Sequence, residues 1–103
     1  ASAIMMTGEK ISASDAARWG MIYKCVADDQ FEEIITRLAQ DLSLMPTHAL
    51  GLTKAALNAS MTNTLDQQLH LEEQYQIEAG GTNDYSEGVT AFMEKRKAVF
   101  IGR

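Results

Sequence analysis

Apolar residues recur at helical spacing along most of the chain, and no long stretch alternates as a half-buried strand would. The pattern is clearest after Asp28 and Asp29, either of which can cap a helix. The apolar positions that follow are three or four residues apart or adjacent: Phe31, Ile34, Ile35, Leu38, Ala39 and Leu42. Side chains at this spacing share one face of an α-helix. The spacing therefore predicts an amphipathic helix after the acidic pair.

A shorter helix is predicted before this one. Ser12 is a good N-cap, and Gly20 is a typical helix stop. Between Gly20 and the acidic pair, Met21–Val26 reads as a short extended connector. Trp19 and Cys25 are expected to pack in the core, since neither has partners in the sequence that would give it a chemical role.

Two further helices are predicted in the second half of the chain. Pro46 lies where a helix over Thr47–Ala59 would begin, and because that segment is apolar on most sides we expect it to be central and buried. Thr64 and Gln67 have the spacing of a capping box, in which each side chain accepts the other residue's backbone N–H. The helix that starts there should end at Gly80–Gly81.

The first eight residues, Ala1–Gly8, look like the last turns of a helix whose beginning is missing. They contain no initiator methionine and no N-cap, yet they are apolar and stop at a glycine. Removal of an initiator methionine would also leave Ala1 first, so that alternative stays open. We expect the chain to be a fragment.

These segments together predict an all-α fold with four or five helices in one domain of 103 residues. No apolar run approaches the roughly 20 residues needed to span a bilayer, and no signal-peptide pattern is present. The single cysteine, Cys25, has no partner for an internal disulfide, which fits a reducing compartment. A cytoplasmic protein with no membrane partner is therefore expected.

The last twenty residues are predicted to form one more helix, with an acidic start and a basic end. Asp84 and Glu87 have a capping-box-like spacing in its first turn. Its apolar face is formed by Tyr85, Val89, Phe92 and Met93. Lys95, Arg96 and Lys97 would then lie in the last turn, where free carbonyl groups carry partial negative charge.

This basic end stands out because the rest of the chain is acidic. The net charge is −5, yet residues 94–103 contain four basic groups and one acidic group. An acidic chain argues against nucleic acid as the partner and suits a single small anion better. The basic cluster can simply complement the helix dipole, or it can hold a phosphate while Phe92 packs against a flat base.

No catalytic group and no metal site can be assembled from the remaining residues. His48 and His70 are far apart and have no second ligand at a suitable spacing. Cys25 lacks a placed histidine that would activate it as a nucleophile.

The terminal residues nevertheless resemble a known family. The segment Glu87–Lys97, followed by Phe100 and Gly102, resembles the C-terminal signature of the crotonase family, the enoyl-CoA hydratases and isomerases. The segment Thr7–Ile22 resembles the part of that family that follows the catalytic core. Residues between Asn63 and Tyr85 most resemble the isomerases of that family that act in phenylacetate degradation.

The resemblance implies a C-terminal helical subdomain spanning residues 1–103, whose spiral catalytic core, with an oxyanion hole for a thioester enolate, lies outside this chain. In the family this subdomain packs on the core, builds a trimer or a dimer of trimers, and reaches a neighbouring subunit's CoA. By position in the motif, Lys95 would contact the CoA phosphate and Phe92 the adenine, with Arg96 a weaker candidate.

The expected parent is thus an enoyl-CoA hydratase or isomerase of fatty-acid or aromatic-acid catabolism. Its substrate would be a CoA thioester, with no covalently bound cofactor, and the 103 residues alone would be inactive. The alternative is a free-standing helical interaction module with no enzymatic parent.

Overall fold

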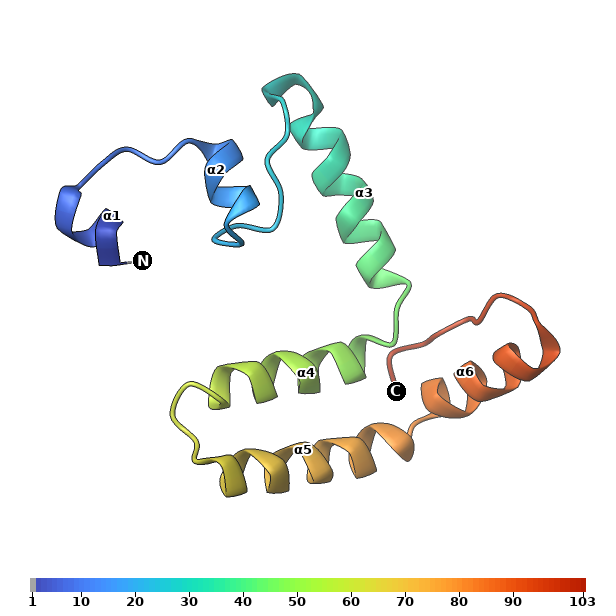
Figure 1. Cartoon of the computed structure of the whole chain (residues 1–103). Coiled ribbons are helices and arrows are strands. Elements are labelled where there is room, and N and C mark those ends of the chain that lie inside the picture. Colours follow the sequence, from blue (N-terminus) through green and yellow to red (C-terminus); the bar gives the residue numbers. More distant parts are fainter. Residues whose placement is uncertain (1) are drawn as a thin grey trace. The chain divides into compact units, whose positions relative to one another are not determined.

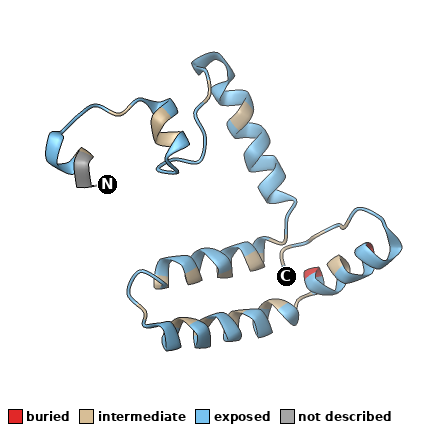
Figure 2. Ribbon diagram, viewed as in Figure 1, coloured by how far each residue is buried: buried red, intermediate tan, exposed pale blue. Residues whose placement is uncertain are grey.

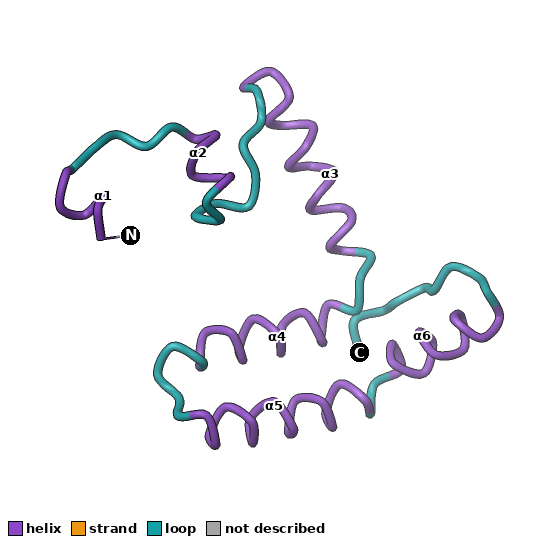
Figure 3. Tube along the Cα trace, viewed as in Figure 1, coloured by secondary structure: helices purple, strands orange, loops and turns teal. Residues whose placement is uncertain are grey.

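The computed structural model describes residues 2–103, and these form helices joined by loops, without strands (Figures 1 and 3). The α-helices are α1 Ser2–Thr7, α2 Ala13–Arg18, α3 Phe31–Ser43, α4 Thr47–Ala59, α5 Leu65–Gly80 and α6 Asn83–Glu94, with a 3₁₀ turn at Asp28–Gln30. The predicted all-α class is confirmed. The α-helices number six in the described part of the chain because the apolar start of the sequence supplies one of them.

The chain divides into two compact units, Ala1–Ile35 and Thr36–Arg103. In the first unit, the backbone N–H of Gly8 donates to the carbonyl of Ile4 at 3.0 Å, and Gly8 adopts a φ of +65°. The predicted glycine stop after α1 is therefore confirmed. Ala1, the first residue of that predicted helix end, lies outside the described residues.

Ser12 caps α2 as predicted, because its hydroxyl accepts the backbone N–H of Asp15 at 3.1 Å. The predicted packing of Trp19 and Cys25 is wrong: Trp19 is 53% exposed, and Cys25 is also exposed. The acidic pair begins a 3₁₀ turn, and α3 itself starts only at Phe31. The six-residue helices α1 and α2 provide too few apolar neighbours to enclose the Trp19 ring.

In the second unit, α4 and α5 form a helical hairpin (Figure 1). The capping box at Thr64 and Gln67 is confirmed: the Thr64 hydroxyl accepts the Gln67 N–H at 3.3 Å, and the Gln67 side chain accepts the Thr64 N–H at 2.9 Å. Helix α5 ends at Gly80, as predicted. The connection to α6 is short, and α5 and α6 also contact each other.

The prediction that the helix after Pro46 is central and buried is wrong. Helix α4 contains no buried residue. Among residues 4–103, whose side-chain exposure is described, the two buried residues are Asp84 and Ala91, both on α6 (Figure 2). The apolar composition of α4 therefore describes a surface that α5 and the last residues of the chain cover only in part.

The last predicted helix is shorter and starts differently than expected. Its N-cap is Thr82, whose hydroxyl accepts the Tyr85 N–H at 3.1 Å, so Asp84 and Glu87 do not form the predicted capping box. The helix ends at Glu94, and the basic run lies beyond its last turn. Residues 97–103, called the C-terminal tail below, continue without helical structure.

Candidate functional site

The C-terminal tail folds back along α6 and is held by acidic side chains of that helix. Asp84 is 2% exposed. Its carboxylate accepts the backbone N–H of Ile101 at 2.7 Å and that of Gly102 at 2.8 Å. The N–H of Asp84 in turn donates to the carbonyl of Arg103 at 3.1 Å. Hydrogen bonds to an ionised acceptor are stronger than neutral ones, so this end of the tail is firmly anchored.

Glu87 anchors the beginning of the tail. Its carboxylate accepts two N–H groups of the Arg96 guanidinium, Nη1 at 2.6 Å and Nη2 at 2.8 Å, and the backbone N–H of Val99 at 2.8 Å. The hydrogen bonds from Arg96, followed by the bond from Val99, lower the pKa of the Glu87 carboxyl from 4.5 to about 2. The carboxylate of Glu87 is therefore ionised throughout the physiological pH range.

Arg96 is occupied by contacts within its own chain. In addition to the paired bonds to Glu87, its Nε donates to the Glu94 carboxylate at 2.6 Å and its Nη1 to the Lys97 carbonyl at 3.2 Å. These two acidic partners, Glu87 before Glu94, raise the pKa of the Arg96 guanidinium above its ordinary value. Little of its hydrogen-bonding capacity is left for a ligand.

Lys95 lies at the turn between α6 and the tail and has an unusual backbone. Its N–H donates to the Phe92 carbonyl at 3.3 Å, while the Arg96 N–H donates to the Ala91 carbonyl at 3.0 Å. This pair of bonds is a Schellman motif, whose left-handed position is usually glycine. Lys95 fills it with φ 55°, and is the one non-glycine residue of positive φ in the described part of the chain.

The Lys95 side chain is exposed, and within residues 2–103 no acidic group lies within ion-pair distance of its ammonium. Phe92, one helical turn before it, is 81% exposed. Phe92 also lines an apolar groove of about 400 Å³ along α6. The other lining residues are Pro46, Ala49, Ala79, Thr82, Asp84, Tyr85, Gly88, Val89 and Phe100. A cation and an aromatic ring therefore lie close together in sequence and are both accessible.

Two glycines lie where the tail meets the helices, and one of them permits a close approach. A Cβ atom at Gly102 would lie 2.6 Å from the Thr47 hydroxyl oxygen at the start of α4, and Gly102 has φ +79°. A Cβ atom at Gly88 would meet the ring of Phe100 at 3.6 Å. The first contact excludes a side chain at Gly102, and the second is an ordinary van der Waals distance. Glycine at 102 is thus required where the tail reaches α4.

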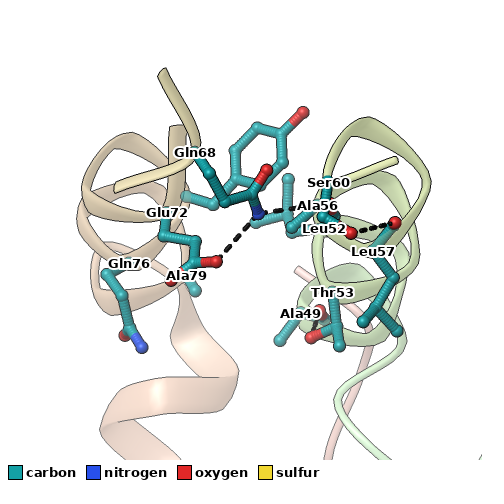
Figure 4. Close-up of a pocket in the computed structure, with 11 residues that line it drawn as sticks. Ala49, Leu52, Thr53, Ala56, Leu57, Ser60, Gln68, Glu72, Gln76 and Ala79 are labelled. Atoms are coloured by element: carbon teal, nitrogen blue, oxygen red, sulfur yellow. Dashed lines mark hydrogen bonds between the residues drawn. The ribbon is translucent and has the colours of Figure 1, made fainter. Parts of the chain in front are cut away.

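A second groove, of about 600 Å³, lies between α4 and α5 (Figure 4). Gln68 is its main polar group: its amide nitrogen donates to the Ala56 carbonyl at 3.2 Å and to the Glu72 carboxylate at 2.8 Å. Asn63 donates to the Gln68 carbonyl oxygen at 3.1 Å. These bonds satisfy the Gln68 amide within the hairpin.

His48 has a partner that the sequence did not suggest. Its Nε2 lies 2.8 Å from the Glu78 carboxylate, which joins the start of α4 to the end of α5. The spacing of 30 residues gives no local signal for this pair.

Within residues 2–103, no group of three His, Cys, Asp or Glu residues is arranged to hold a metal ion. No helix of this part of the chain is long and apolar enough to cross a membrane.

Comparison with known proteins gives a consistent result. The model of the family described as enoyl-CoA hydratase/isomerase matches residues 1–103. The 1,2-epoxyphenylacetyl-CoA isomerase of Escherichia coli K12 is 45% identical over 103 residues, which is all of this chain and 39% of the relative. A Rhodobacter capsulatus protein assigned as an enoyl-CoA hydratase is 41% identical, again over all of this chain and 40% of the relative.

The fold is similar to solved structures of the same family. A crystal structure of a Mycobacterium abscessus protein, assigned as an enoyl-CoA hydratase/isomerase, superposes with a TM-score of 0.89 and 30% identity. The match covers 99% of this chain and 39% of that one. The chain thus spans about two fifths of the length of the proteins it matches here.

Proposed function

The chain belongs to the enoyl-CoA hydratase/isomerase family, and from that premise we propose that it is the C-terminal helical subdomain of such an enzyme. Its role is to pack on the catalytic core, to build contacts between subunits, and to contribute a CoA contact. The match to relatives more than twice as long supports this role. The family match over residues 1–103 favours this role over a free-standing interaction module with no enzymatic parent.

The CoA contact is assigned to Lys95 and Phe92. The observation that carries it is the left-handed backbone of Lys95, at a position where glycine would avoid strain of about 1–2 kcal/mol. Strain of this kind at an exposed residue is typical of functional positions. The accessible ammonium suits a phosphate of CoA, and the exposed Phe92 ring suits the flat adenine. CoA is here the carrier part of the substrate.

Arg96 receives a different role from that suggested by its place in the basic run. Its guanidinium is bonded to Glu87 and Glu94. We therefore assign it to holding the tail against α6, and leave phosphate binding to Lys95.

The contacts between subunits are assigned to the apolar side chains that α5 and α6 expose. Leu65 and Leu69 on α5 are 73% and 55% exposed, and Met93 on α6 is 74% exposed. Apolar side chains that lie together on a surface mark interaction sites. A trimer, or a dimer of trimers, would cover them.

The reaction proposed for the complete enzyme is that of the family: the thioester enolate forms in an oxyanion hole that belongs to the core. The 45% identity to the E. coli isomerase favours an acyl group derived from phenylacetate. The single, exposed Cys25 is compatible with the cytoplasm.

The deciding experiment replaces Lys95 in the complete enzyme that carries this segment. Lys95→Ala should raise the KM for acyl-CoA about tenfold, as expected when a charge-assisted hydrogen bond is lost, and leave kcat nearly unchanged. Lys97→Ala is the matched control, since it removes the same charge two residues further on. Equal KM values for Lys95→Ala and the parent would refute the CoA contact.

A second experiment tests the division of labour between the subdomain and the core. The 103-residue chain, assayed alone with crotonyl-CoA or an unsaturated phenylacetyl-CoA analogue, should show no turnover above background. Measurable turnover would mean that the catalytic groups lie within this chain.

A further inference from the structure

We propose that Glu87 is a positioning residue for acyl-CoA binding: by holding Arg96 and the N–H of Val99 it fixes the chain beyond Lys95 and thereby places the Lys95 ammonium. The inference rests on the proposed function, since it assumes that Lys95 contacts CoA. It adds an acidic residue to a site that the sequence describes only by its basic and aromatic members.

The hydrogen bonds show how Glu87 can act on Lys95, although the two residues are eight positions apart along α6. Lys95 is preceded by Glu94, the last residue of α6, and is followed by Arg96. Arg96 is fixed twice, by its backbone N–H to the Ala91 carbonyl at 3.0 Å and by its guanidinium to Glu87 at 2.6 and 2.8 Å. Lys95 thus lies between two residues that are both held to the helix.

The left-handed conformation of Lys95 makes this support necessary. A non-glycine residue at positive φ persists only when the surrounding structure holds it there. Glu87 bonds Arg96 and, through the Val99 N–H at 2.8 Å, also the chain three residues further on. Loss of Glu87 would release both bonds and let Lys95 return to an ordinary backbone conformation, which would move its ammonium.

Positioning and simple electrostatics predict opposite results. If Glu87 acted only as a negative charge near the basic run, its neutralisation would strengthen the attraction for phosphate and lower the KM. If it positions Lys95, its neutralisation weakens the phosphate contact and raises the KM. The direction of the change therefore identifies the role.

The test is Glu87→Gln in the complete enzyme, measured with acyl-CoA and with the matching acyl-pantetheine thioester, which lacks all phosphates and the adenosine. The KM for acyl-CoA should rise about fivefold, somewhat less than for loss of the Lys95 contact itself. The value of kcat and the KM for acyl-pantetheine should not change. A KM for acyl-CoA that is unchanged or lower overturns the inference.

Glu94→Gln is the matched control. Glu94 also bonds Arg96, at 2.6 Å, but it accepts no backbone N–H from the tail. Its neutralisation removes one charge near Lys95 while Glu87 still holds Arg96 and Val99, so the KM for acyl-CoA should stay the same or fall. An equal rise in both variants would show that any loss of charge beside Arg96 has this effect, and would overturn the special role of Glu87.

Comparison of Glu87→Gln with Lys95→Ala separates this inference from the proposed function. If Lys95→Ala raises the KM and Glu87→Gln does not, only the positioning role fails; if Lys95→Ala has no effect, both fail. The double variant Glu87→Gln/Lys95→Ala should match Lys95→Ala alone, because the two residues act through one contact. Should Glu87→Gln prove unstable, Arg96→Lys removes the paired bonds with the charge retained, and should raise the KM for acyl-CoA in the same way.

Discussion

The α4–α5 hairpin and the α6–tail segment both belong to residues 36–103, but they are held together by different kinds of contact. The hairpin is joined by apolar side chains, the Gln68 amide and the His48–Glu78 pair, and neither of its helices has a buried residue. The α6–tail segment is joined by carboxylates that bind backbone N–H groups, and it contains buried Asp84. The α6–tail segment is thus held by polar contacts made within this chain, whereas the hairpin leaves apolar surface exposed.

The largest effect is expected where the hairpin exposes leucines. Leu65→Glu/Leu69→Glu in the complete enzyme should abolish subunit assembly, because full burial of two leucines contributes roughly 3–6 kcal/mol. Light scattering after size exclusion should show the molar mass falling to that of the monomer. Gln74→Glu, at an exposed polar position of the same helix, should leave the molar mass unchanged. If the leucine variant assembled normally, the exposed surface would not be an interface.

The next effect concerns the buried anchor of the other segment. Asp84→Asn keeps the shape of the side chain but loses the charge that attracts the Ile101 and Gly102 N–H groups. Charge-assisted bonds of this kind contribute about 1.5–3 kcal/mol, so hydrogen exchange at these two amides should accelerate at least about tenfold. Asp66→Asn, an exposed change in the first turn of α5, should leave this exchange unaltered, and equal acceleration by both variants would contradict the anchor.

The same contrast explains what the sequence reveals. The capping box at Thr64 was predictable because both of its bonds join residues three apart, which is a distance that sequence spacing describes directly. Asp84 and Glu87 show the same spacing, and yet their carboxylates bind the tail 12–18 residues further on. Thr82 takes the cap because its short hydroxyl accepts the Tyr85 N–H, which leaves both carboxylates free for distant partners.

The apolar pattern has a corresponding limit. The run from Thr47 to Ala59 correctly predicts a helix, but spacing describes a face and not the surface that covers it, so burial of α4 could not be read from this chain. The basic run raises the same difficulty for Arg96 and Lys95, which look alike in sequence. Only the paired bonds to Glu87 distinguish the residue that holds the tail from the residue whose side chain stays accessible.

A third effect should appear only in acid. The folded-state pKa of Glu87 is lowered to about 2 from 4.5 by Arg96 and then Val99, so its contribution to tail attachment is fully present above about pH 4.5. It should be lost progressively as the pH falls from 4.5 to 2. Titration of the Glu87 carboxyl carbon by NMR should give a midpoint near 2. In Arg96→Gln that midpoint should move back toward 4.5, and a midpoint already near 4.5 in the parent would contradict the pairing.

The smallest effect tests whether the strain at Lys95 is kept for binding. Lys95→Gly should stabilise the end of α6 by about 0.5–1 kcal/mol, since glycine adopts positive φ freely but loses more entropy on folding. Slower hydrogen exchange at the amides of residues 95 and 96 should report this gain, whereas Lys97→Gly should give none. Lys95→Gly should also raise the KM for acyl-CoA, because it removes the ammonium group. A more stable helix end that binds acyl-CoA less well would show that the polar segment, complete within this chain, keeps a strained residue for a ligand. Unchanged stability would mean that the left-handed turn carries no strain, and the argument for Lys95 would lose its main support.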